Sequence, residues 1–342
     1  MRFLKWLAVV LVILFCGGWF AARLGIERAA EQGLAEARAH GVQAEVASLS
    51  VGGFPTRLDL QATEVKLADP VSGAGWQGPL LRIFAASWAP WDLTAELPAQ
   101  QVITLPDQTL TIESTALKAA LVSAPDTDLP LRRLDASADA LTAQSDLGWQ
   151  IGFGEVSVAL TEDPGRGANT YALALDLAPL RPAPAFLQAL AAVTLPDLPP
   201  SDLPAEVERI DGDIGLRLTA PLDRHAGETN PQLEAIEIRT LDLAWGALSL
   251  HAEGGMTASP DGYAEGRILL EVRGWDRLPA LLVATGALKP EVAPTIASFL
   301  RAMAGESPDP GVLALPLIME GGRMSLGPFP LGAAPMLRGP VG

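Results

Sequence analysis

Arg57-Leu58-Asp59-Leu60-Gln61-Ala62 carries an apolar side chain at every second position, with a polar side chain before each one. This period of two is typical of a β-strand with one dry face and one wet face. The alternation changes phase before Val65 and Leu67, as a bulge or a bend in the strand requires. The stretch therefore predicts a long, half-buried strand of an antiparallel sheet.

The same alternation recurs along most of the chain. Turn sequences such as Asp163-Pro164-Gly165 and Ser259-Pro260-Asp261-Gly262 separate the runs. We therefore expect a body of mostly antiparallel β structure. The apolar positions of the further runs are Leu110 and Ile112; Leu134, Ala136, Ala138 and Ala140; Val156, Val158 and Leu160; Tyr171, Leu173, Leu175 and Leu177; Ile214, Leu216 and Leu218; Ile236 and Ile238; Leu241 and Leu243; Leu248 and Leu250; and Ile268, Leu270 and Val272.

Three segments have helical character instead. Ile26–His40 has high helix propensity and an apolar stripe, and Gly41 is expected to end it. Ala183–Val193 and Leu278–Met303 interrupt the strands, and Lys289-Pro290 divides the second of them. The sequence thus predicts an α+β fold in which a few helices pack on a long, twisted, elongated sheet.

The N-terminal run Phe3–Ala22 is apolar apart from Lys5. At about 1.5 Å of rise per helical residue, it extends about 30 Å, the thickness of the hydrocarbon core of a bilayer. A cleaved secretory signal is the alternative, because Arg2 and Lys5 form a positive start. The run lacks a small-x-small cleavage site. We therefore expect residues 1–24 to form an uncleaved transmembrane signal-anchor.

Charge around this run predicts its orientation. Arg2 and Lys5 precede it, so the positive-inside rule keeps the N-terminus in the cytoplasm, although Arg23 and Arg28 weaken the asymmetry. An excess of Arg over Lys and abundant Ala are typical of GC-rich bacterial genes. We expect a single-pass protein of the bacterial inner membrane that contacts the lipid bilayer through residues 3–22, with its body in the periplasm.

A spaced set of landmarks occurs twice along the body. In each copy a Trp is followed 15 residues later by a Pro in a turn, then by a strand, then by a Pro that opens a helix. The landmarks are Trp149, Pro164 and Pro184 in the first copy and Trp245, Pro260 and Pro279 in the second. We interpret the copies as a duplication that gives two related halves, 25–193 and 205–342, joined by a Pro-rich seam, 194–204.

Composition excludes several kinds of function. The formal net charge of −16 disfavours a nucleic-acid role, which needs basic patches against phosphate. The single cysteine, Cys16, falls in the apolar run, so the body has neither disulfides nor thiolate metal ligands. No cofactor is expected.

Motifs for catalysis are missing as well. The three histidines are far apart in the sequence, and there is no metal-binding helix, nucleophile elbow or phosphate-binding loop. We interpret Asp211-Gly212-Asp213 as a turn and Trp88-Ala89-Pro90-Trp91 as a packed corner. The sequence predicts no catalytic residue and no metal site, and we expect no enzymatic activity.

Two stretches rich in Gly and Pro frame the body: Gly52-Gly53-Phe54-Pro55-Thr56-Arg57 and Gly321-Gly322-Arg323-Met324-Ser325-Leu326-Gly327-Pro328-Phe329-Pro330-Leu331-Gly332. The first contains Gly-Phe-Pro-x-Arg, and the second ends in Leu-Gly-Pro-x-Pro-Leu-Gly. Gly52 and Gly53 allow a tight turn. Pro55 keeps Phe54 extended, so that its ring is expected to fill a corner of the core. Structural roles are expected for Gly52, Gly53, Phe54, Pro55, Arg57, Gly327, Pro328 and Pro330.

These paired motifs, with a signal-anchor and helix before them, make the chain resemble the bacterial domain of unknown function 2125 family (DUF2125). The resemblance covers essentially the whole chain. It implies an envelope protein of unassigned activity. In its plan of an anchor and a long β-sheet, the chain is also similar to the AsmA-like envelope proteins, which are associated with lipid movement, by architectural analogy alone.

Two hypotheses about function follow. In the first, an apolar β groove binds a lipid, such as a phospholipid, or another hydrophobic ligand. In the second, the protein is a structural or partner-docking scaffold of the envelope without a ligand; the sequence identifies no protein partner. The residues expected to line the groove are Leu173, Leu175, Leu216, Leu218, Leu248, Leu250 and Ile268.

Overall fold

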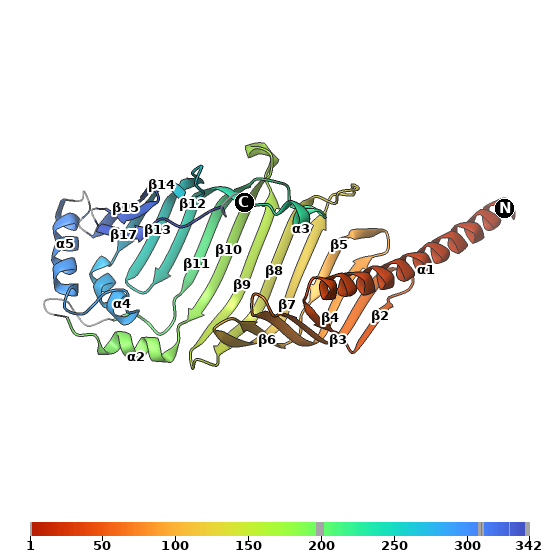
Figure 1. Cartoon of the computed structure of the whole chain (residues 1–342), viewed down its shortest axis with the longest axis horizontal. Helices are drawn as coiled ribbons and strands as arrows, with labels where there is room; N and C mark the ends of the chain where they lie inside the picture. Colours follow the sequence, from red (N-terminus) through yellow and green to blue (C-terminus); the bar gives the residue numbers. More distant parts are fainter. Residues whose placement is uncertain (1, 196–201, 307–308, 310, 328, 339–342) are drawn as a thin grey trace. The chain divides into compact units, whose positions relative to one another are not determined.

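In a computed structural model, the chain forms two compact units. Unit 1 comprises Met1–Pro125 and Ala136–Gly148, and unit 2 comprises Asp126–Asp135 and Trp149–Gly342. The structure describes residues 2–195, 202–306, 309, 311–327 and 329–338, with side chains from residue 16 onward except those of residues 306 and 329. Figure 1 shows the chain coloured from its N-terminus to its C-terminus.

Unit 1 begins with a single helix, α1 (Arg2–Ala39), which includes the helix predicted for Ile26–His40. It ends where expected, at Gly41, whose φ of 92° is the left-handed conformation that glycine adopts readily. Among the residues that the structure describes, no helix is both long enough and apolar enough to cross a membrane. Most of the predicted span Phe3–Ala22, over residues 3–15, lies outside the described side chains, so the span stays a prediction.

The rest of unit 1 is antiparallel β-sheet. Both β1 and β2 pair with β3, and β3 pairs with β4. Both β5 and β6 then pair with β4 and with β7. The strands are β1 (Gln43–Glu45), β2 (Ser48–Gly52), β3 (Arg57–Asp69), β4 (Ala74–Ala86), β5 (Ala89–Glu96), β6 (Gln100–Leu105) and β7 (Gln108–Ser123).

Strand β3 confirms the predicted change of phase. Leu58 and Ala62 are buried, and the next buried side chain is Val65, three positions later. Between them, Glu64 has a φ of 50°, in the left-handed region that non-glycine residues seldom adopt. This one residue turns the following side chains over, so both parts of the strand bury their apolar residues.

Unit 2 is a meander in which each strand from β9 to β17 pairs antiparallel with the next. Strand β8 (Leu131–Ser145) begins in unit 2 and ends in unit 1. The mostly antiparallel β fold expected from alternation is therefore confirmed. The strands are β9 (Gln150–Glu162), β10 (Thr170–Arg181), β11 (Arg209–Leu218), β12 (Leu233–Trp245), β13 (Leu248–Ala258), β14 (Ala264–Arg273), β15 (Val312–Glu320), β16 (Arg323–Leu326) and β17 (Phe329–Ala333).

Helices follow two of the hairpins in unit 2. Helix α2 (Pro184–Ala192) connects β10 to β11, while α4 (Leu278–Ala284) and α5 (Ala293–Glu306) connect β14 to β15. A short helix, α3 (Ala226–Thr229), lies between β11 and β12. The helices predicted at Ala183–Val193 and Leu278–Met303 are confirmed, and the second is divided where Lys289-Pro290 predicted it.

Two core clusters of unit 2 lie between these helices and the sheet. One cluster joins Leu190 of α2 and Ala280 of α4 to Leu248 and Val272 of the sheet. A second joins Leu300 of α5 to the strand β15. Val272 is only 2% exposed, as is expected of a side chain sealed between a sheet and its covering helices.

The two segments with matching landmarks have the same element order. Each is an antiparallel hairpin, β9–β10 or β13–β14, followed by a helix. Pro184 is the first residue of α2, and Pro279 is the second residue of α4, where a missing N–H is tolerated. The compact units have other bounds than the predicted halves 25–193 and 205–342, and duplication stays a prediction.

The Pro-rich seam 194–204 lies partly outside the described residues, at 196–201. Hydrogen bonds to side chains of unit 2 fix its described end. Arg277 donates two hydrogen bonds of 2.7 and 2.8 Å to the carboxylate of Asp202, and these bonds hold the pKa of Asp202 below its usual value. The carbonyl of Pro204 accepts a 2.8 Å hydrogen bond from the indole of Trp245.

The strand bounds show that two interpretations of local sequence were wrong. Asp211-Gly212-Asp213 lies inside strand β11 and forms no turn. Its aspartates face one side of the sheet, and its glycine lies in an apolar row on the other. Trp88 lies in no packed corner: it occupies the exposed turn between β4 and β5, and 65% of its surface is accessible.

Candidate functional site

The sheet of unit 2 has one apolar face. Residues that pair directly across antiparallel strands point to the same side, so the register reveals rows of side chains. The central apolar row contains Val158, Leu175, Gly212, Leu241, Ala252, Leu270 and Leu315. By alternation along each strand, all seven predicted groove residues lie on the same face as this row. They are Leu173, Leu175, Leu216, Leu218, Leu248, Leu250 and Ile268.

The structure divides these seven residues into two groups. Leu248, Leu250 and Ile268 contact helices or the C-terminal segment and belong to closed core clusters. They are packing residues of the fold. Among the described residues, those clusters include none of the other four, Leu173, Leu175, Leu216 and Leu218. Their role as ligand contacts stays a prediction.

The second group forms part of what we call the open apolar face. It consists of Val158 and Leu160 on β9, Leu173 and Leu175 on β10, and Ile214, Leu216 and Leu218 on β11. All of these side chains are partly exposed. Side chains on neighbouring strands shield part of their surface, but none of the seven belongs to the three core clusters of the described residues. Figure 1 shows α4 and α5 beside the later strands of unit 2, away from β9 and β10.

Both ends of this face are bounded within unit 2. At one end, Leu180 and Ile210 pack on the cluster under α2. At the other end, Tyr171 is buried and its phenol oxygen accepts a 2.8 Å hydrogen bond from the backbone N–H of Leu222, in the connection that holds α3. Burial raises the pKa of the Tyr171 phenol, which keeps it neutral. The open face is thus a stretch along the strands with a protein wall at each end.

Gly212 lies in the central apolar row, between Leu175 and Leu241. A Cβ atom there would lie 3.1 Å from Leu241 Cδ1 and 3.4 Å from Leu175 Cγ. Because glycine has no side chain, these two leucines close over the strand backbone. Even a Cβ atom would be crowded by them, so glycine at this position allows the leucines of the two neighbouring strands to pack closely.

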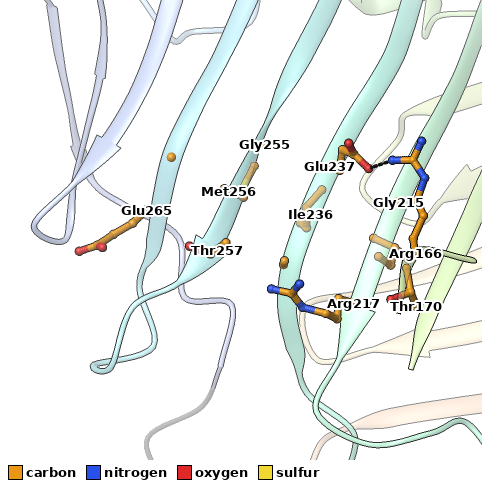
Figure 2. A pocket seen from close by; sticks show the side chains of 13 residues that line it. Arg166, Thr170, Gly215, Arg217, Ile236, Glu237, Gly255, Met256, Thr257 and Glu265 are labelled. Carbon is orange, nitrogen blue, oxygen red and sulfur yellow. Dashed lines mark hydrogen bonds and ion pairs between the residues drawn. The ribbon is translucent and has the colours of Figure 1, made fainter. Parts of the chain in front are cut away.

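The opposite face of the sheet is charged. A hollow of about 640 Å³ lies there, and Figure 2 shows the side chains that line it. Arg166 pairs with Glu237 at 2.6 Å, and Arg217 pairs with Glu234 at 3.1 Å. An added Cβ at Gly215 would lie 3.2 Å from Glu237 Oε2, which places this glycine in the floor beneath the charges. Both lining arginines are thus already neutralised by carboxylates.

Carboxylates also form a row across this charged face. Arg209 forms ion pairs with two of them, at 2.7 Å to Asp176 and 3.1 Å to Asp211. His251 hydrogen-bonds Asp242 at 2.7 Å. Within the described part of the chain, no group of three or more histidine, cysteine, aspartate or glutamate side chains is arranged to hold a metal ion. From β10 to β14, the row consists of four carboxylates and one histidine: Asp176, Asp211, Asp242, His251 and Glu271.

The first motif, Gly52–Arg57, forms the turn between β2 and β3. Gly53 has a φ of 92°, and its carbonyl accepts a 2.9 Å hydrogen bond from the N–H of Arg57. A side chain at Gly53 would meet Arg57 O at 2.9 Å, so this position requires glycine. The expected tight turn is present.

Phe54 does not fill a corner of the core, and that expectation was wrong. Half of its surface is exposed. The turn directs the ring toward α1, where it stacks with Phe20 and meets the edge of Trp19. The indole of Trp19 donates a 2.7 Å hydrogen bond to the carbonyl of Arg57, so this motif holds helix α1 against the sheet of unit 1.

The closing motif lies at the end of unit 2. Gly327 has a φ of 54°, and its N–H donates a 2.7 Å hydrogen bond to Pro316 O. Pro330 lies in β17 opposite Ser325 of β16. Pro328 lies outside the described residues. Gly327 therefore reverses the chain between the last two strands.

A comparison with family models finds a match whose range includes both motifs. The model of a family described as uncharacterised proteins conserved in bacteria, DUF2125, matches residues 19–335, nearly the whole chain. The chain belongs to the DUF2125 family. No curated protein and no solved structure matches it.

The DUF2125 match begins at Trp19, the residue that seats α1 on the first motif. Sequence reasoning did not assign Trp19 to the body, because it stands within the apolar run. It also left Val158, Leu160 and Ile214 out of the predicted groove, although they show the same alternation as the leucines that were chosen. Cross-strand register, which needs the structure, places them on the open apolar face.

Proposed function

We propose that this protein is held at the bacterial inner membrane and binds a lipid or another hydrophobic ligand on the open apolar face of unit 2. The observation that supports the proposal is that face itself. Partly exposed aliphatic side chains stand side by side on β9, β10 and β11 between a helix-covered wall and Tyr171. Soluble proteins seldom expose contiguous apolar patches above a few hundred Å² unless something binds there.

Acyl chains suit such a surface physically. Transfer of each CH₂ group from water to an apolar environment contributes about 0.8 kcal/mol. An extended chain lying along the strands would contact Leu173 and Leu175 in succession, with Ile214 and Leu216 on the neighbouring strand. The face offers apolar contact and the charged groups lie on its reverse, so the chemistry favours binding an apolar chain over transforming it.

The anchor gives the proposal its location. The run Phe3–Ala22 is long enough to span the bilayer, and the positive residues before it favour a periplasmic body. A protein held there would meet lipids at a high local concentration. Family membership adds the whole-chain plan but no activity.

A scaffold without a ligand is the second candidate. The acidic surface of the chain, with a formal net charge of −16, favours docking of a basic partner. In that case the open apolar face would be covered by a protein surface instead of lipid. The two candidates differ in what contacts Leu175.

Site-specific photocrosslinking separates them. A benzophenone amino acid replaces Leu175 on the open face or, as a matched control, Ala174, the exposed neighbour on the charged face. After irradiation of intact bacteria, the full chain is purified in mild detergent and weighed. We expect a phospholipid-sized adduct at position 175 and none at 174.

A protein adduct at position 175 without lipid would favour the scaffold, and equal lipid labelling at both positions would refute the binding face. Native mass spectrometry gives an independent readout. The double variant Leu173→Gln and Leu175→Gln should lose the lipid that copurifies with the wild type, while Ala174→Gln should retain it.

A further inference from the structure

A group of aromatic side chains gathers at one end of unit 1. Trp19, Phe20 and Phe54 lie within 5.1 to 5.7 Å of one another, measured between ring centroids. Trp19 is buried, at 4% exposure, whereas Phe20 and Phe54 are 52% and 50% exposed. The buried indole fixes the helix, and the two phenyl rings on top of it face outward.

The turn between β4 and β5 adds a further ring at the same end. Ser87 donates a 3.0 Å hydrogen bond from its N–H to Thr56 O and a 3.1 Å hydrogen bond from its hydroxyl to Pro55 O. The neighbouring Trp88 has 65% of its surface exposed. We call Phe20, Phe54 and Trp88 the aromatic rim.

Helix α1 leaves unit 1 at this rim. Trp19 is bonded to Arg57 at the start of β3, and Arg38 donates a 2.7 Å hydrogen bond to Ala44 O in β1. Strand β1 pairs with the far end of β3, at Lys66–Ala68. The helix therefore runs along β3 away from the rim. Figure 1 shows the N-terminal part of α1 extending beyond the strands of unit 1.

We propose that the aromatic rim inserts into the headgroup region of the bilayer and seats unit 1 directly on the membrane. The inference rests on the proposed membrane anchor. Phe20 stands two residues before the end of the predicted span Phe3–Ala22, so a span in the bilayer places the rim at the boundary between hydrocarbon and headgroups. Trp and other amphipathic rings concentrate at this depth in membrane proteins.

The surroundings of the rim fit a phospholipid surface. Arg57 is exposed at the same turn, with its guanidinium 4.1 Å from the centre of the Phe84 ring, and can meet headgroup phosphates. Exposed phenyl rings that already pack on a buried indole lose little further side-chain freedom on insertion. The family motif at Gly52–Arg57 then has a purpose beyond making a turn: it holds Phe54 at the membrane boundary.

A fluorescent label tests the depth of the rim. In full-length protein carrying Cys16→Ser, Trp88→Cys is labelled with the environment-sensitive fluorophore NBD and reconstituted into phosphatidylcholine vesicles. The matched control is Val71→Cys, which is 93% exposed in the turn at the other end of β4. The 13 residues of β4 place the two turns about 40 Å apart at the usual rise per strand residue.

We expect NBD at position 88 to emit at shorter wavelength and to lose most of its emission when the vesicles contain lipid with a doxyl quencher near the headgroup. NBD at position 71 should keep its emission. Flotation of the vesicles is measured first: protein that does not float refutes the anchor. Protein that floats while positions 88 and 71 respond alike refutes the rim and leaves the anchor standing.

Discussion

Two regions of the unit 2 sheet have the same alternating sequence pattern and different surroundings. On β14 and β15, Val272 and Leu313 are sealed beneath helices at 2% and 1% exposure. On β10 and β11, Leu175 and Leu216 belong to the same face and remain partly exposed. Alternation thus indicates that a strand has one apolar face. Whether other elements bury that face depends on how the rest of the chain packs.

Chain order explains the difference in cover. Helices α4 and α5 are inserted between β14 and β15 and fold back onto the strands that flank them. Helix α2, inserted between β10 and β11, packs beside α4, and in the described part of the chain its core cluster meets β10 and β11 near their ends, at Leu180 and Ile210. The helices therefore cover the later strands of unit 2 more than β10 and β11.

Truncation of a leucine in each region should give the largest contrast. Leu313→Ala leaves a cavity under α5 and should lower the free energy of unfolding by about 2 to 5 kcal/mol. Leu175→Ala removes a side chain that is already partly wet, and should lower it by about 1 kcal/mol. Denaturant unfolding of the full chain in mild detergent measures both changes.

Lipid sharpens the same comparison. Delipidated protein should show the small effect at Leu175, whereas lipid-loaded protein should show a larger one, because a ligand bound to the native state adds to its stability. The effect at Leu313 should not depend on lipid. Equal losses at the two positions in delipidated protein would contradict the distinction between a covered and an open region.

A medium effect is expected at Trp245, which closes the covered region beside the seam. Trp245→Phe removes the indole N–H that bonds Pro204 O and loses packing against Phe186. The Pro204 carbonyl loses this donor and the smaller ring underfills the buried site of Trp245, which is 6% exposed, so unfolding should become easier by about 1 to 3 kcal/mol. Trp88→Phe, the same change at an exposed position, should leave the stability close to that of the wild type. Thermal unfolding of the two variants side by side measures the contrast.

The sequence predicts much of this fold because its strands and breaks depend on local physics. Alternation located β3, β9 to β14 and the phase change at Glu64. Gly41 ends α1, and Lys289-Pro290 falls between α4 and α5, as expected from backbone sterics. The predicted groove leucines share one face for the same reason: a period of two fixes the side on which each residue of a strand lies.

Long-range packing was out of reach. The sequence around Phe54 suits a corner of the core, but the turn at Gly53 directs its ring toward Trp19 and Phe20 of α1, which lie more than 30 residues earlier in the chain. Asp211-Gly212-Asp213 has the composition of a turn and lies in a strand, because Gly212 is opposite Leu175 and Leu241 in an apolar row. Neither outcome follows from residues that are neighbours in sequence.

The smallest expected effect lies on the charged face behind the covered region. His251 Nδ1 and Asp242 Oδ1 are 2.7 Å apart, and this hydrogen bond raises the pKa of His251 above 6.5, with Glu253 and Glu271 adding to the shift. A raised pKa means that the folded state binds the proton more tightly than the unfolded state. The resulting stabilisation is complete below about pH 6.5 and is lost as the pH rises through the raised value.

His251→Gln should abolish this slope, because glutamine does not titrate, and Asp242→Asn should flatten it by removing the partner while keeping the histidine. Unfolding midpoints measured across the neutral pH range give the slope for each protein. Lipid capture at position 175 should be unchanged in both variants, since these side chains point away from the open apolar face. A slope that survives both substitutions would assign the pH dependence to another group, and a change in lipid capture would show that the two faces of the sheet are coupled.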